Sequence, residues 1–115
     1  MTSGGTPDRD GDCRIQVLLP VQLRALAEIG PEVTVVVEGG DDDVPTPRRL
    51  LDALEAMHPS LRGTIRHHDT GARRAYMRYF VGTEDVSHED PDAPLPPEVR
   101  SGEEPFRILG AIAGG

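Results

Sequence analysis

The last two residues of the sequence, Gly114 and Gly115, are the residues whose type and position best suit a chemical role. A terminal Gly-Gly segment is slim, because it has no Cβ atoms and its φ angles are unrestricted. Its carboxylate can therefore reach into a narrow active site on another protein and serve there as a substrate. The alternative interpretation is a frayed chain end, since small residues are common at disordered termini.

Three histidines and one aspartate are the residues that best resemble metal ligands. His67 and His68 are adjacent, Asp69 follows them, and His88 lies 20 positions further along the chain. Adjacent histidines rarely hold one ion together, so we interpret residues 67–71 as a solvent-exposed turn. The sequence predicts no metal site and shows no catalytic constellation.

The single cysteine, Cys13, excludes an intramolecular disulfide and zinc sites of the multi-cysteine type. It lies in the buried phase of an expected strand, which favours an inert core thiol over a nucleophile. One cysteine also agrees with a reducing cytoplasm, where we expect the protein to act.

The composition indicates one acidic domain. The chain has 115 residues, of which 37% are hydrophobic, and a formal net charge of -8. This charge argues against a nucleic-acid partner and favours a basic protein surface, although it also serves solubility alone. No stretch resembles a signal peptide or a membrane span, so we expect no membrane partner. Residues 1–12 have the composition of a disordered leader.

The first half of the expected domain alternates strands and helices. Cys13, Ile15, Val17 and Leu19 follow the period of two that is typical of a strand with one buried face. Residues 20–30 then suit a short helix that Gly30-Pro31 ends, and residues 33–38 form a β-branched strand.

The main helix has the clearest signals in the sequence. Thr46 suits the N-cap and Pro47 the first helical position, while Pro59 ends the helix. Its apolar stripe is expected to pack against a sheet, and consists of Leu50, Leu51, Leu54 and Met57.

The second half predicts further strands and one long loop. Residues 75–81 suit a third strand that closes at Gly82, and residues 85–87 suit a short fourth. Residues 88–105 are acidic and rich in proline, which predicts an irregular, exposed loop. Phe106, Ile108 and Leu109 form the last strand. We therefore expect residues 13–115 to be one α+β domain, with a mixed sheet of four or five strands packed on one main helix.

Several segments together resemble the MoaD/ThiS family of ubiquitin-like β-grasp sulfur carriers. The similar segments are the main helix at 48–59, the strand and turn at 79–86, the stretch 92–95 and the ending 108–115. The ending is similar to those of molybdopterin synthase small subunits and of the cysteine-forming carriers of actinobacteria. The chain departs from the family at Gly82, where relatives often have asparagine, and at Gly110, where many have proline.

The resemblance implies a carrier that is not itself an enzyme, although it could be the small subunit of a synthase. An adenylating enzyme of the ubiquitin-activating type would activate Gly115 with ATP and Mg, and Gly114 would thread through its channel. A sulfurtransferase or another sulfur donor would convert the carboxylate to a thiocarboxylate, and an acceptor synthase would take the sulfur. The product would be molybdopterin, cysteine, thiamine or a sulfur-containing secondary metabolite. The chain itself would bind no cofactor.

The partner is expected to dock on the exposed side of the sheet near the last strand. Candidate contacts are Arg78, Phe80, Arg107, Ile112 and Ala113. Phe80 has a competing interpretation as a core residue, since strand aromatics are more often buried. Two other functions stay open: a non-covalent interaction or regulatory module, and a ubiquitin-like modifier that forms isopeptides with lysines.

Overall fold

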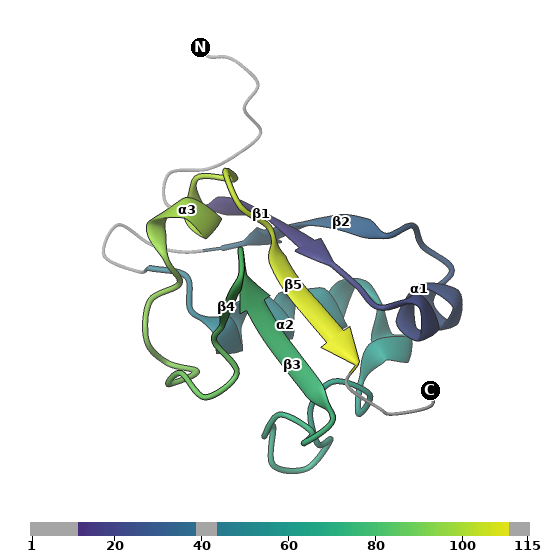
Figure 1. Ribbon diagram of the computed structural model, residues 1–115. Helices are drawn as coiled ribbons and strands as arrows, with labels where there is room; N and C mark the ends of the chain where they lie inside the picture. Colours follow the sequence, from purple (N-terminus) through teal and green to yellow (C-terminus); the bar gives the residue numbers. More distant parts are fainter. Residues whose placement is uncertain (1–11, 39–43, 111–115) are drawn as a thin grey trace.

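Five strands form one mixed sheet in the computed structural model, which describes residues 12–38 and 44–110 (Figure 1). The strands are β1 (Cys13–Leu18), β2 (Glu32–Val37), β3 (Met77–Val81), β4 (Glu84–Asp85) and β5 (Phe106–Gly110). Their order across the sheet is β2-β1-β5-β3-β4. β5 pairs parallel with β1 and antiparallel with β3, so the last strand of the sequence occupies the centre of the sheet. The predicted α+β architecture is confirmed.

β1 and β2 form an antiparallel pair whose alternation sets the two faces of the sheet. Ile15, Val17 and Val35 are fully buried on the inner face, while alternate residues face outward. The helix α1 (Val21–Ala27) connects the two strands. It ends earlier than the predicted Gly30-Pro31 boundary, because Glu28 adopts a left-handed conformation with φ of 58° and its N–H bonds back to Ala25.

The main helix α2 (Pro47–Met57) covers the inner face of the sheet (Figure 1). The Thr46 side chain accepts a hydrogen bond from the N–H of Arg49, and Pro47 is the first helical residue, as predicted. Leu50, Leu51 and Leu54 are buried. Met57 is 48% exposed, so the prediction that it belongs to the core stripe is wrong: it is the last residue of the helix.

β3 and β4 form a hairpin that turns at Gly82. Its φ of 61° lies in the left-handed region, which glycine and asparagine adopt more readily than other residues. The glycine at position 82 thus meets the backbone requirement of this turn. β3 begins at Met77, two residues later than predicted, and β4 covers Glu84–Asp85 instead of residues 85–87.

The segment before β5 is more ordered than its proline content predicts. It contains the helix α3 (Pro97–Arg100), and Leu95 and Val99 are buried in the core. The prediction of an irregular, exposed loop over residues 88–105 is therefore wrong in its middle. Pro97 suits the first turn of a helix, where its missing N–H costs nothing. A further single turn, η1 (Pro59–Leu61), follows α2 and buries Leu61.

Candidate functional site

The predicted contact residues of the sheet lie together on its outer face, which is the face that α2 does not cover. Across the strands, Phe80 on β3 pairs with Arg107 on β5, and Arg107 pairs in turn with Leu18 on β1. Arg78 pairs with Leu109 in the next row. We call these five residues the outer patch. Phe80 is half-buried, whereas Tyr79 on the same strand points inward and is buried. The aromatic core residue of this strand is therefore Tyr79 and not Phe80.

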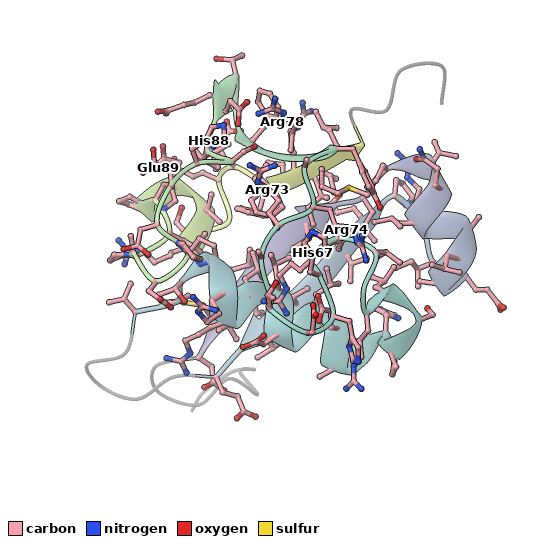
Figure 2. The ribbon with its side chains drawn as sticks, turned by 90° about the horizontal axis from the view of Figure 1, so that it is seen from below. His67, Arg73, Arg74, Arg78, His88 and Glu89 are labelled. Carbon is pink, nitrogen blue, oxygen red and sulfur yellow. The ribbon has the colours of Figure 1, made fainter. Side chains whose placement is uncertain are left out.

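The outer patch combines apolar side chains with two arginines. Nη1 of Arg78 lies 3.6 Å from a carboxylate oxygen of Asp85 and 3.5 Å from Nε2 of His88, and Figure 2 shows Arg78 and His88 side by side. Hydrogen bonds from Ser87 lower the pKa of Asp85, and the charge of Arg78 acts in the same direction. Arg107 is exposed and makes no ion pair with a described residue. The patch therefore presents positive charge on a protein whose net charge is negative.

The outer patch ends where the chain leaves the sheet. Gly110, the last residue of β5, pairs with Met77, and a Cβ built on Gly110 would lie 3.6 Å from the side-chain nitrogen of Gln22 on α1. The chain neighbours of Gln22, Met77 and Gly110 include three exposed apolar residues, namely Val21, Tyr76 and Leu109. Sequence reasoning missed Val21 and Tyr76 as site residues, because an isolated exposed apolar residue has no periodic signal.

Four predicted site residues, Ile112, Ala113, Gly114 and Gly115, lie outside the described residues, as does most of the predicted leader at 1–12. Their roles stay predictions.

The histidines occupy positions that agree with an exposed turn. His67 and His68 are exposed, and the N–H of Gly71 donates to the carbonyl of His67 across the turn. Within residues 12–38 and 44–110, no three His, Cys, Asp or Glu side chains are grouped closely enough to hold a metal ion. Cys13 is half-buried at the start of β1.

The strand order and the single main helix define an α+β protein of the ubiquitin-like β-grasp fold, and solved structures share this fold over most of the chain. The crystal structure of SAMP1 from Haloferax volcanii aligns with a TM-score of 0.64 over 89% of this chain and 99% of that chain, at 20% identity. The solution structure of the small archaeal modifier protein 1 from Methanosarcina acetivorans aligns with a TM-score of 0.65 over 90% and 98%, at 17% identity.

A chain in the crystal structure of the Amycolatopsis orientalis BexX/CysO complex aligns with a TM-score of 0.63, over 87% of this chain and 98% of that chain, at 21% identity. No protein-family profile and no curated protein sequence matches the chain. At these identities the likeness establishes the fold. In the described part of the chain, no helix has the length and apolar character that crossing a membrane requires.

Proposed function

We propose that the chain is a sulfur carrier whose Gly115 carboxylate is activated by a partner enzyme and converted to a thiocarboxylate. The observation that carries this proposal is the central position of β5, which pairs on both edges and leads at Gly110 into the five residues that end in Gly114-Gly115. Because β5 is hydrogen-bonded to a strand on each side, the point at which residues 111–115 leave the sheet is fixed. The fold shared with small archaeal modifier proteins and with the BexX/CysO complex supports the same function.

Activation is required because a carboxylate is a poor electrophile. Its oxygen would attack the α-phosphorus of ATP on an adenylating enzyme, forming an acyl-adenylate and releasing pyrophosphate. Sulfide would then attack the acyl carbon and release AMP, which leaves a thiocarboxylate at Gly115. With a persulfide donor, an acyl disulfide forms first and a second thiol reduces it to the thiocarboxylate. The carrier acts as a co-substrate in the cytoplasm, and the enzymes of the partner complex supply the catalytic groups.

The outer patch is the surface on which we expect the adenylating enzyme to dock. Phe80 and Leu109 offer apolar area, and Arg107 offers a charge that no described carboxylate compensates. The outer patch adjoins Gly110, after which the last five residues of the chain begin. A partner enzyme bound to the patch would therefore hold Gly115 near the partner's active site.

The decisive measurement is the intact mass of the chain after incubation with an adenylating enzyme, ATP and sulfide. A gain that corresponds to exchange of one oxygen for one sulfur is expected, and removal of Gly115 should abolish it. The mass of the untreated protein first verifies that Gly115 is its terminal residue. An unchanged mass, with a partner that is active on its own carrier, contradicts the proposal and favours the non-covalent interaction module.

Two variants test separate parts of the proposal. Gly114→Ala should leave the fold intact and depress activation, because a side chain would block passage through a narrow channel. Arg107→Glu should weaken docking by about tenfold. Arg62→Glu is the matched control, since it makes the same charge change after η1, away from the outer patch.

The modifier alternative differs only in the acceptor. Conjugates of higher mass that require Gly115 and resist thiols would indicate isopeptides with lysines of other proteins. The sequence contains no lysine, since all 12 of its basic residues are arginine. Such conjugates therefore cannot grow through an ε-amine of this chain.

A further inference from the structure

A cavity of about 610 Å³ lies on the helix-covered side of the sheet, away from the outer patch. It opens between the start of α2, the turn that precedes β3, and the segment that follows β4. Its apolar wall consists of Pro47, Leu51, Tyr79, Val86, Leu95 and Phe106. This volume is in the range of pockets that bind small organic molecules.

Tyr79 places an unpaired polar group in this wall. The residue is 6% exposed, and its ring packs against Phe106 with the ring centroids 5.2 Å apart. Its hydroxyl has no hydrogen-bond partner among the described residues. Buried hydroxyl groups in proteins are nearly always hydrogen-bonded, so a ligand that enters the cavity and displaces the side chains over this hydroxyl would supply the partner that it lacks.

Arg73 places an uncompensated charge in the same cavity. Its Nε donates to the carbonyl of Ser87 at 3.1 Å, and its Nη1 donates to the carbonyls of Met77 and Arg74 at 2.7 and 3.2 Å. These acceptors are neutral, and Nη2 donates to no described residue. Figure 2 shows Arg73 between the segment that carries His88 and Glu89 and the turn that carries His67 and Arg74.

The other two arginines of the cavity are already neutralised. Arg66 contacts Asp52 and Glu55 at 2.9 Å, and Arg48 contacts Asp92 at 2.7 Å. Arg73 is therefore the guanidinium that a ligand anion would pair with in this wall. Burial raises the pKa of Tyr79 to about 12, while the positive charges of Arg66 and Arg73 oppose this rise.

Acidic residues limit how much negative charge a ligand can carry. Glu84, Glu89 and Asp90 are exposed and also line the cavity. Their charges would repel a nucleotide or another polyanion more strongly than a single carboxylate. Because the wall consists of aliphatic, proline and aromatic side chains, the rest of the ligand must be mostly apolar.

We propose that this cavity binds a small monocarboxylate with an apolar body, whose carboxylate pairs with Arg73 and accepts a hydrogen bond from the Tyr79 hydroxyl. The apolar body would lie against Leu51, Leu95 and Phe106. This inference concerns the opposite side of the sheet from the outer patch and does not depend on the carrier function.

The test is an NMR titration of the isotope-labelled full chain with 4-phenylbutanoate, beside its neutral analogue 4-phenylbutan-1-ol. Saturable shifts are expected at the amides of Ala72, Arg73, Val86 and Ser87. The alcohol should bind at least about tenfold more weakly, because it lacks the charge that pairs with a guanidinium.

Variants decide which side chains select the carboxylate. Arg73→Met should weaken binding by about tenfold, and Tyr79→Phe by about threefold to tenfold, since each removes one donor. Arg74→Met is the matched control, because the neighbouring Arg74 bonds to the carbonyl of Gly63 and lies outside the cavity. If Arg73→Met does not fold, Tyr79→Phe and the alcohol still decide the outcome.

Three results would overturn the proposal. The first is the absence of binding up to about 10 mM carboxylate, which is weaker than a built site gives. The second is equal binding of the acid and the alcohol. The third is a set of shifts confined to the outer patch.

Discussion

Tyr79 belongs both to the core of the fold and to the wall of the cavity. The same burial that leaves its hydroxyl without a partner among the described residues raises its pKa to about 12. The sequence predicted a strand here and could not indicate the cavity, because its walls come from residues far apart along the chain. Only the folded arrangement brings residues 47–51, 66–73 and 79–96 together.

The raised pKa of Tyr79 makes folding stability depend on alkaline pH. The phenol loses its proton near pH 10 in the unfolded chain and near pH 12 in the folded one. Stability is therefore fully present below about pH 10 and declines as the pH rises towards about 12. Between about pH 9 and 11.5 the wild type should lose up to about 2 kcal/mol relative to Tyr79→Phe. Urea unfolding of both proteins measures this difference, and a constant difference across the pH range would refute the prediction.

At the scale of elements, the main helix was predictable because its signals are local. Thr46, Pro47 and the leucine stripe each act within a few residues, and the structure contains the helix they predict. Arg78, Phe80 and Arg107 were expected on the exposed side of the sheet, and the pairing of β3 with β5 places them on one face because alternate residues of a strand share a face.

The cap of the main helix offers a direct test of this local contribution. Thr46→Ala removes the acceptor of the Arg49 N–H, so the free energy of unfolding should fall by about 1 kcal/mol. Thr46→Ser should retain most of this stabilisation, because serine also has a hydroxyl acceptor. Denaturant unfolding measures the change, with Thr83→Ala as a control in an exposed turn, and equal values for the two alanine variants would show that the cap contributes nothing.

The proline-rich segment before β5 was not predictable from local patterns. Leu95 and Val99 are single apolar residues among prolines and acids, so they produce neither a period of two nor a helical period. Their burial follows from the tertiary fold, which places α3 against β1 (Figure 1).

Leu95 should therefore behave as a core residue in spite of its surroundings in the sequence. Leu95→Ala is expected to lower the free energy of unfolding by about 3 kcal/mol, since the side chain is 1% exposed. Leu26→Ala, on the exposed side of α1, should change it by less than about 0.5 kcal/mol. Thermal or urea unfolding compares the two, and a small effect at Leu95 would restore the exposed-loop interpretation.

At the scale of the whole molecule, the absence of lysine limits which amines of this chain an activated Gly115 can acylate. All 12 basic residues are arginine, whose guanidinium groups stay protonated and are poor nucleophiles towards an acyl-adenylate. Within the 115 residues, an α-amino group would be the amine that remains available for self-acylation. This composition suits a carrier that must keep its activated carboxylate for sulfur.

The prediction is that activation without a sulfur donor yields no multimers of the 12.4 kDa chain once its α-amino group is acetylated. Arg62→Lys introduces one exposed ε-amine and should permit slow formation of a covalent dimer. Denaturing electrophoresis with a reducing agent detects both outcomes. A ladder in the lysine-free protein would mean that the acyl group reaches another nucleophile of the chain. This test depends on the proposed activation at Gly115.

The central position of β5 also has a mechanical consequence. A partner that pulls on the residues after Gly110 applies force along a strand with neighbours on both sides. The hydrogen bonds to β1 and β3 then bear the load together in shear, whereas an edge strand pulled sideways would lose its bonds one at a time. Repeated insertion and withdrawal of the tail should therefore leave the domain folded, which single-molecule pulling from the C-terminal end would measure as a high unfolding force.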